Sequence, residues 1–422
     1  MAKVSRRQFL AASTAAIAPL ILPSGVLAAP GRPGANDRLI TGHIGVGGMG
    51  SGHLNAFRHN AGAVCDVDQN HLKAAVERVG RPVDTYTDYR YILDRKDIDA
   101  VVVASPDHWH GVQTVHACEA GKDVYCEKPA CNTIEEGQAM VRAAKRFGRI
   151  VQIGSQGRST RAAHAACTYL RNGQIGQVTR VECWHYENPV GGDPGKNGPA
   201  PPELDWDLWL GPARWVPYNP ERVHFNFRWF LDFGGGNIRD RGAHVLSVVL
   251  WCLDLDHQGP VRVTATGNPP PHGLWDCPTS MEVTYEFKEP ELTVVWAQPG
   301  VKPVEAGFGA MYYGTNDSLL VTGGDGGCGT EDKAMNYTPP SDGVTPFKSP
   351  GHRENWLECI RTREKPLMNI EAAHRVASMC VLGNISYRLR RPLEWDPVNE
   401  RVVGDEQANL MLSNPGRGPF HV

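Results

Sequence analysis

Ile44-Gly45-Val46-Gly47-Gly48-Met49-Gly50 is the stretch of sequence that decides the fold of this chain. An apolar run precedes it and a helical pattern follows it, which is the context of a strand–turn–helix unit that binds a dinucleotide. In such a unit the first glycine permits the tight turn, the second lets the backbone approach a pyrophosphate, and the third lets the helix pack closely on the strand. The positive end of the helix then faces the phosphates. The stretch therefore predicts a cofactor site that includes Gly45, Gly47, Gly48, Met49 and Gly50.

An acidic side chain stands where the same motif requires one, about 20 residues further on at the end of the next strand. Asp66 is that residue, and Asp68 is the second choice. A carboxylate there accepts a hydrogen bond from the ribose 2′-hydroxyl and repels a 2′-phosphate, so we expect NAD as the cofactor in preference to NADP. The alternative is a structural glycine turn followed by a solvated aspartate.

Short apolar runs alternate with helical patterns along the first part of the chain, which predicts a parallel sheet with helices on both faces. The expected strands are 39–45, 63–67, 100–104, 124–126 and 150–154. The expected helices are one that ends near residue 59, then 70–79, 112–120 and 133–147. Thr133 starts the last helix and Glu136 stands three residues on, which is the pattern of a capping box.

The pattern changes after residue 155, where strand-like runs begin to follow one another. The expected strands there are 178–185, 261–266, 280–287, 291–297 and 318–322, and the expected helices are 162–171, 240–252, 352–362 and 371–388. Residues 188–204 are rich in Gly, Pro and Asn and are expected to form a long loop. This part of the chain is therefore predicted to be α+β with a largely antiparallel sheet.

The segment 1–29 has the features expected of an export signal. Ser5-Arg6-Arg7-Gln8-Phe9-Leu10 has the twin-arginine pattern and a short apolar stretch follows it. Val26-Leu27-Ala28 and Leu27-Ala28-Ala29 are the expected small-residue cleavage sites. We expect a twin-arginine signal peptide, the twin-arginine export machinery as a partner, and a mature protein that is periplasmic or otherwise exported. That route carries folded proteins, so a cofactor could be bound before export. The alternatives are an ordinary basic N-terminus and an uncleaved membrane anchor.

Composition argues against several other classes of function. The formal net charge is -3 and basic residues form no blocks, so nucleic-acid binding has no electrostatic footprint. No segment after residue 29 is long and apolar enough for a stable membrane span. The 11 cysteines lack metal-type spacing, so we expect buried free thiols and no metal site.

Two loops that follow predicted strands of the parallel sheet carry polar side chains. Ser105-Pro106-Asp107-His108-Trp109-His110 follows one strand, and Glu127-Lys128-Pro129 follows the next. Ligands of open α/β sheets bind beyond the carboxyl ends of the strands, so both loops are expected at the ligand. Outside that context Lys128 would be an ordinary surface lysine. The expected cofactor contacts in these loops are Ser105, Pro106, Asp107, His110, Glu127 and Lys128.

These motifs, with Gly154-Ser-Gln-Gly-Arg158, the segment 234–244 (Gly-Gly-Gly-Asn-Ile-Arg-Asp-Arg-Gly-Ala-His) and 355–361 (Asn-Trp-Leu-Glu-Cys-Ile-Arg), resemble the Gfo/Idh/MocA family of glucose–fructose oxidoreductase and inositol dehydrogenase. The resemblance covers nearly all of the mature chain. It implies an α/β Rossmann domain, here 36–155, followed by an α+β domain with an open, mainly antiparallel sheet, here 156–422. It also implies a homo-oligomer, either a dimer or a tetramer.

The resemblance further implies catalytic roles for Lys128, Asp240 and His244. The lysine reaches the nicotinamide ribose and the substrate, Glu127 orients it, and the histidine is the acid–base. From the residues alone, Asp240 and His244 are four apart and would share one face of a helix. An imidazole titrates near neutral pH, which suits proton transfer. The alternative is a helix cap with a packed histidine, and Ser247 departs from the acidic residue that many relatives carry three positions after this histidine.

The expected function is an NAD(P)-dependent oxidoreductase that acts on CH–OH groups of a sugar, cyclitol or related polyol and holds its cofactor tightly. One alternative is an NAD-requiring enzyme of the same family that cleaves glycosides by oxidation, elimination and reduction. Another is a cofactor-stabilised binding protein without turnover. Side chains that suit a hydroxyl-rich ring by hydrogen bonding or stacking are Gln156, Arg158, His185, Arg228 and Trp229.

Overall fold

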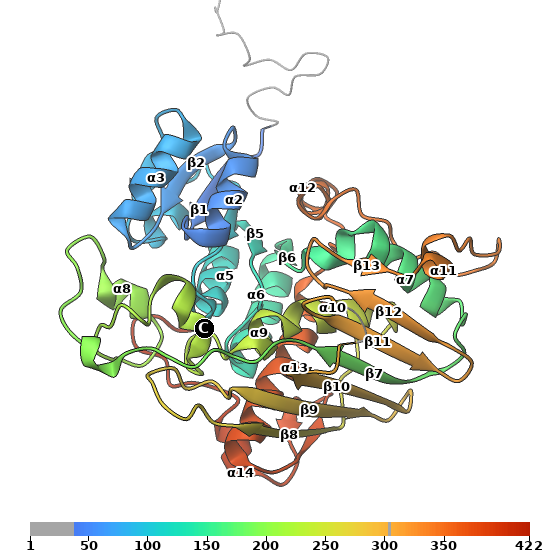
Figure 1. Cartoon of the computed structure of the whole chain (residues 1–422). Helices are drawn as coiled ribbons and strands as arrows, with labels where there is room; N and C mark the ends of the chain where they lie inside the picture. Colours follow the sequence, from blue (N-terminus) through green and yellow to red (C-terminus); the bar gives the residue numbers. More distant parts are fainter. Residues whose placement is uncertain (1–37, 303–304) are drawn as a thin grey trace, which may run out of the picture. The chain divides into compact units, whose positions relative to one another are not determined.

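A computed structural model describes residues 38–302 and 305–422. The predicted signal peptide, residues 1–29, lies outside the described residues. The unit from Thr41 to Val422 contains two β-sheets, one of six strands and one of nine (Figure 1). All eleven cysteines lie in the described part of the chain and are free thiols. Among the helices described, none has the length and apolar character needed to cross a bilayer.

The first sheet is parallel and has the strand order β3-β2-β1-β4-β5-β6. Every residue of β1, β4 and β5 is buried, as expected for a parallel sheet covered on both faces. The order reverses between β1 and β4, and at such a switch point a Rossmann fold has its ligand crevice. The strands are β1 (Thr41–Ile44), β2 (Ala61–Cys65), β3 (Asp84–Tyr86), β4 (Ala100–Val103), β5 (Asp123–Cys126) and β6 (Val151–Ile153).

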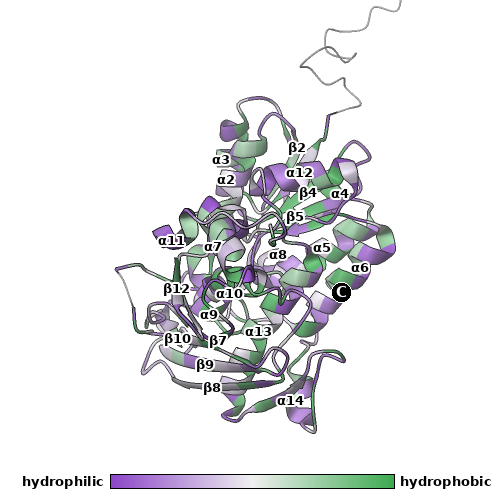
Figure 2. Ribbon diagram, turned by 90° about the vertical axis from the view of Figure 1, so that its right-hand side faces the viewer, coloured by the Kyte–Doolittle hydropathy of each residue, from purple (hydrophilic) through white to green (hydrophobic). Residues whose placement is uncertain are grey.

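The helices of this half confirm the predicted alternation. Thr133 and Glu136 form the predicted capping box, and Gly148 ends the helix in the left-handed conformation. The ribbon of α6 alternates between purple and green in Figure 2, as expected for a helix with one polar and one apolar face. The helices are α2 (Gly48–Phe57), α3 (Gln69–Val79), α4 (Arg90–Leu93), α5 (His110–Glu119) and α6 (Ile134–Phe147).

The second sheet is mixed and mainly antiparallel, which confirms the predicted fold class. Only β7 and β10 pair in parallel among its described strands. Its order is β13-β12-β11-β7-β10-β9-β8-β14-β15. The strands are β7 (Val178–Trp184), β8 (Arg262–Asn268), β9 (Ser280–Phe287), β10 (Leu292–Gln298), β11 (Gly309–Gly314), β12 (Ser318–Thr322), β13 (Gly329–Thr330), β14 (Leu393–Asp396) and β15 (Arg401–Val402).

Helices connect this sheet with the first half. α13 contacts both β8 and α6, and α10 contacts α13 and α7. Every residue of α10 is buried, because the helix is apolar on all sides. The helices are α7 (Arg161–Arg171), α8 (Trp206–Leu210), α9 (Asn237–Asp240), α10 (Gly242–Cys252), α11 (Asp332–Met335), α12 (His352–Thr362), α13 (Ile370–Leu389) and α14 (Glu406–Leu410), with 3₁₀ turns η2 (Asp107–Trp109), η3 (Gln156–Ser159), η4 (Pro194–Lys196) and η5 (His224–Trp229).

The predicted helix 240–252 is in fact two helices. Asp240 ends α9, and α10 begins at Gly242. The amide of His244 donates to the carbonyl of Arg241, three residues back, at 3.1 Å, which tightens the chain at the junction. Asp240 and His244 therefore belong to consecutive helices rather than to one helical face.

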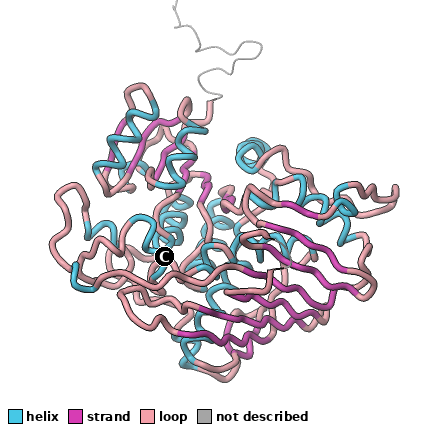
Figure 3. Tube along the Cα trace, in the orientation of Figure 1, coloured by secondary structure: helices cyan, strands magenta, loops and turns pink. Residues whose placement is uncertain are grey.

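Residues 185–236 connect β7 to α9 and are called the covering loop below. Figure 3 shows this connection mostly as loop, interrupted by short helical turns. The amide of Asp205 donates to the carbonyl of Val67 at 3.0 Å, and the amide of Gln69 donates to the carbonyl of Glu203 at 2.9 Å. These bonds attach the loop to the parallel-sheet half just after β2. An apolar cluster holds the loop in shape: Leu204, Trp209, Leu210, Val223, Phe227, Phe230 and Phe233.

Candidate functional site

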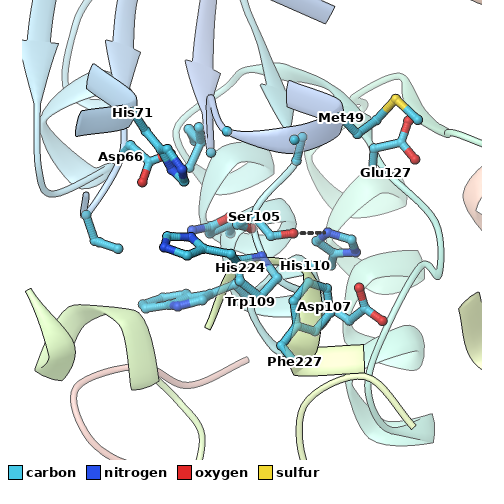
Figure 4. Close-up of a pocket in the computed structure, with 18 of the residues that line it drawn as sticks. Met49, Asp66, His71, Ser105, Asp107, Trp109, His110, Glu127, His224 and Phe227 are labelled. Atoms are coloured by element: carbon cyan, nitrogen blue, oxygen red, sulfur yellow. Dashed lines mark hydrogen bonds and ion pairs between the residues drawn. The ribbon is translucent and has the colours of Figure 1, made fainter. Parts of the chain in front are cut away.

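A cavity of about 750 Å³ opens at the carboxyl ends of the parallel strands. Gly45 follows β1, Asp66 follows β2, Ser105 lies two residues beyond β4, and Glu127 follows β5, and all four line it. Figure 4 shows Asp66 and Glu127 on different sides of this cavity. The parallel order of the strands brings together loops that are far apart in the sequence.

The glycines of the turn leave room for a ligand because they carry no side chains. Gly45 has a φ of 77°, and a Cβ on it would lie 2.5 Å from the backbone nitrogen of Ser105. A Cβ on Gly50 would lie 1.9 Å from the carbonyl oxygen of Gly45, so the helix can pack on the strand only with glycine there. Gly47, Gly48 and Met49 line the cavity, whereas Gly50 lies behind it. No side chain caps the start of α2, which is the arrangement that a bound phosphate requires.

Asp66 is held in place from three directions. Its carboxylate accepts hydrogen bonds from the amide of Val46 at 2.9 Å and from the amide of Asp68 at 3.0 Å, and the Nδ1 of His71 lies 3.3 Å away. Asp68 also lines the cavity, but one of its oxygens caps α3 by accepting from the amide of Asn70 at 2.8 Å. Asp66 is therefore the carboxylate that reaches back to the glycine turn.

The loop after β4 places Ser105, Pro106, Asp107 and His110 on the cavity wall. The ring of His110 bonds the carbonyl of Ser105 at 2.9 Å and that of Pro129 at 2.7 Å, which ties this loop to the loop after β5 (Figure 4). Burial raises the pKa of Asp107. His108 points elsewhere, with its Nε2 3.0 Å from the carbonyl oxygen of Trp209.

Glu127 lies at the centre of a buried network. The Nε2 of His53 lies 2.7 Å from its carboxylate, and the side chain of Gln156 donates to it at 2.8 Å. Burial opposes ionisation, but the hydrogen bond and charge of His53 outweigh burial and lower the pKa of Glu127 to about 2. Its other oxygen accepts from the amide of Lys128 at 3.2 Å, and the Lys128–Pro129 bond is cis. These contacts match a role in orienting the lysine.

Lys128 and Asp240 both line the cavity and form an ion pair with each other. The ammonium donates to the carbonyl oxygen of Asp240 at 3.1 Å and also to its carboxylate. The guanidinium of Arg228 lies 3.2 Å and that of Arg241 3.5 Å from the same carboxylate. Burial opposes ionisation of Asp240, but Lys128 and Arg228 hold its pKa well below the usual range. Lys128 is thereby fixed with its ammonium at the cavity.

His244 lines the same cavity and is 3% exposed. Its Nδ1 is buried and has no hydrogen-bond partner among the described residues. Burial, followed by the positive charge of Lys128, lowers the pKa of His244 to about 3. The ring is therefore neutral near pH 7, so one of its nitrogens carries a free lone pair. Ser247 does not orient it, because the Ser247 hydroxyl accepts from Arg158 at 2.9 Å.

The predicted substrate contacts divide into two groups. Gln156 and Arg228 line the cavity. Arg158 does not, because it is buried and its guanidinium bonds both oxygens of Asp256 at 2.6 Å. His185 and Trp229 are also absent from the wall and pack against aromatic side chains. Arg158, His185 and Trp229 therefore lie outside the wall of this cavity, and their contact with a substrate stays a prediction.

Several wall residues could not be selected from the sequence. The covering loop contributes Leu204, Leu208, Trp209, His224, Phe225 and Phe227, and other segments contribute His71, Arg241, Asp325 and Arg353. The aromatic run His224-Phe-Asn-Phe-Arg-Trp229 was a visible signal, but only contacts in space separate its wall residues from its packed ones.

Comparisons with known proteins agree with this geometry. Residues 40–155 match the sequence family described as "Oxidoreductase family, NAD-binding Rossmann fold", named GFO_IDH_MocA. Residues 173–294 and 343–422 match its companion, described as "Oxidoreductase family, C-terminal alpha/beta domain". Together the two matches cover most of the chain.

Curated relatives match over less than half of the chain. An inositol 2-dehydrogenase from Salmonella typhimurium is 30% identical over 154 residues, which are 35% of this chain and 46% of that enzyme. A glycosyl hydrolase family 109 protein from Shewanella pealeana is 30% identical over 207 residues, 43% of this chain and 45% of that protein. The chain thus spans about half the length of the curated relatives it matches.

Solved structures share the fold over most of the chain. The WlbA dehydrogenase from Bordetella pertussis, in complex with NADH and UDP-GlcNAcA, superposes with a TM-score of 0.62 at 16% identity, covering 85% of this chain and 99% of that one. A levoglucosan dehydrogenase in complex with NADH and levoglucosan has a TM-score of 0.60 at 19% identity, covering 85% and 99%.

Proposed function

We propose that this chain, which belongs to the Gfo/Idh/MocA family of oxidoreductases, moves a hydride between NAD and a CH–OH group of a sugar, cyclitol or related polyol. One observation carries the proposal. A single cavity joins the glycine turn after β1 to the Lys128–Asp240 pair and to His244. The dehydrogenase relatives and the structures solved with NADH and a sugar ligand support it.

The residues present fit an NAD molecule. The glycine turn would hold the pyrophosphate, and Asp66 would accept hydrogen bonds from the adenosine ribose. Asp66 lines that part of the cavity and would repel a 2′-phosphate, which favours NAD over NADP. The nicotinamide would lie toward Lys128 and His244, with the loop at Ser105–His110 beside it.

The side chains at that end of the cavity can perform the proton transfer. The neutral ring of His244 accepts the proton of the substrate hydroxyl as hydride leaves the same carbon. Bound NAD supplies the hydride acceptor. The ammonium of Lys128 donates to the hydroxyl oxygen and offsets its developing negative charge. Asp240 keeps the ammonium in place, and Glu127 fixes the backbone of the loop that carries it.

The test is turnover of a panel of free sugars, cyclitols and polyols, followed as nicotinamide reduction, with His244→Ala as the comparison. We expect oxidation of at least one polyol by the unaltered protein and loss of turnover in the variant. A binding protein without turnover would show no activity and no effect of the substitution on any measured behaviour, and that result would reject the proposal.

Glycoside cleavage through transient oxidation is the second candidate, favoured by the similarity to a glycosyl hydrolase family 109 protein. In that reaction the hydride taken from the sugar returns to it, so the cofactor shows no net change. Product analysis separates the two candidates. Release of an aglycone without net reduction of NAD supports cleavage, whereas an oxidised sugar with equimolar NADH supports the dehydrogenase.

We also propose that residues 1–29 direct export by the twin-arginine route and that the exported enzyme keeps its NAD tightly bound. The supporting facts are the Arg6-Arg7 pattern and a covering loop that contributes part of the cavity wall. The test is mass spectrometry of protein purified from the exported fraction. A nicotinamide dinucleotide on a shortened chain is expected. A full-length chain confined to the cytoplasm would reject export, and exported protein without cofactor would reject tight binding.

A homo-oligomer, dimer or tetramer, remains a prediction. Its test is the molar mass of the purified protein in solution by light scattering, where a monomer at every concentration would reject it.

A further inference from the structure

Three metal-ligating side chains meet at the cavity edge, beside the end assigned to adenosine. Asp68 caps the start of α3, His71 lies in its first turn, and His224 comes from the covering loop. One ligand atom of each lies within 4.8 Å of the others. The Oδ2 of Asp68 and the Nε2 of His224 are 3.6 Å apart. That separation is close to the roughly 3.4 Å between ligand atoms of a tetrahedral site with bonds of about 2.0–2.1 Å.

Two of the three side chains are held by partners that leave one ligand atom of each available. A carboxylate only accepts, so the contact of 3.3 Å between Asp66 and the Nδ1 of His71 places the proton of a neutral ring on Nδ1. The Nε2 then carries a lone pair. A carboxylate on the far nitrogen is the usual partner of a metal-binding histidine. Asp68 uses Oδ1 to accept from the amide of Asn70 at 2.8 Å, while Oδ2 faces His224.

His224 reaches this position through an uncommon backbone. Its φ is 53°, in the left-handed region that residues other than glycine adopt at a cost, often at functional sites. This conformation brings its ring to 4.9 Å from the ring of His71, between centroids, and Figure 4 shows the two rings arriving from different parts of the chain.

The local charge also favours a cation. Asp66 and Asp68 form ion pairs only with His71 and His224 among the described residues, and no lysine or arginine there pairs with either carboxylate. Two carboxylates beside two imidazoles thus lack a permanent positive charge. A divalent ion would supply it.

We propose that Asp68, His71 and His224 bind a divalent transition-metal ion of the Zn²⁺ class, which joins the covering loop to the parallel-sheet half. Two imidazoles and one carboxylate suit Zn²⁺, Co²⁺ or Ni²⁺, whereas Mg²⁺ and Ca²⁺ prefer oxygen ligands alone. The proposed site differs from the sequence-based expectation of no metal, which rested on the spacing of the cysteines along the chain. It goes beyond the proposed function and does not depend on it.

The test is a titration of Co²⁺ into the tag-free full chain, followed by visible absorption. We expect one ion per chain with the intense band of a four- or five-coordinate site. His71→Ala and His224→Ala should each weaken binding at least about tenfold. His272→Ala, which removes an exposed histidine outside the cavity wall, should leave binding unchanged.

Thermal unfolding gives a second readout that does not depend on cofactor or activity. Zn²⁺ should raise the melting temperature of the unaltered protein and not that of His224→Ala, which removes a half-exposed side chain. Circular dichroism confirms that each variant is folded. Absence of Co²⁺ binding, or binding that both cavity substitutions leave intact, would overturn the proposal.

Discussion

The glycine turn at 45–50 and the covering loop at 185–236 line one cavity but are built in opposite ways. The turn acts through its backbone, and its close packing has no room for a Cβ at Gly45 or Gly50. The covering loop acts through side chains, and its own aromatic cluster holds it in shape. The difference separates a part of the wall that backbone packing fixes from a part that side chains form, so substitutions should affect the two parts in different ways.

The largest effect is expected from filling the turn. Gly50→Ala should destabilise the protein by about 1–3 kcal/mol through overpacking and abolish NAD binding, because its Cβ would lie 1.9 Å from the Gly45 oxygen. Gly52→Ala is the matched control on the same helix, since an added Cβ there meets nothing within 4 Å. The control should gain about 0.5–1 kcal/mol. Chemical unfolding measures the stability of each variant, and calorimetric titration measures its affinity for NAD. Equal stability and equal affinity in the two variants would contradict close packing at Gly50.

Removal of the proposed base should come next. His244→Ala should lower turnover roughly 10²–10⁴-fold while NAD still binds, because the glycine turn is untouched. His185→Ala is the comparison, because His185 was also expected at the substrate but lies outside the wall. Steady-state kinetics with NAD titrations decide the matter. Similar losses of turnover in both variants would mean that the cavity wall does not define the site.

Acid should destabilise the fold through groups in both halves. Burial, followed by the charge of His53, lowers the pKa of His43 in β1 to about 3, and His244 is lowered to about 3 as well, from an ordinary 6.5. The unfolded chain therefore binds more protons below pH 6.5, and stability is lost as the pH falls from 6.5 toward 3. Glu127 adds a loss between its ordinary pKa of 4.5 and about 2. The melting temperature should fall steadily as the pH falls over this range. A melting temperature that does not change with pH would contradict the lowered pKa values of these three side chains.

The smallest effect is expected at Asp66. Asp66→Asn removes the charge that repels a 2′-phosphate, so the preference for NAD over NADP should fall roughly tenfold, about 1.4 kcal/mol. Asp88→Asn is the control, because Asp88 also lines the cavity but forms an ion pair with Arg90. Dissociation constants for both cofactors give the ratio. A ratio that shifts more in the control would assign the discrimination to Asp88.

Features set by local sequence were predictable, and features set by tertiary contact were not. The glycine turn, the capping box at Thr133 and the strand runs of the first sheet each follow from neighbouring residues, and the structure contains them. β11 went unpredicted because glycines bound the few apolar residues of Gly309–Gly314.

The residues of the cavity wall were also hard to predict from the sequence, because tertiary contacts decide which side chains reach the cavity. Arg158 and Arg228 look alike in sequence, yet Asp256 and Ser247 hold the first in the interior and only the second reaches the cavity. Nothing in the order of residues places His224 beside His71, because that contact depends on the path of the covering loop.

A crystal structure of the protein with NAD tests the central claim most directly. The account predicts the pyrophosphate against the backbone of Gly45–Gly50 and the nicotinamide in contact with both the Lys128 ammonium and the His244 imidazole. A dinucleotide bound elsewhere, or a nicotinamide that contacts neither side chain, would contradict it.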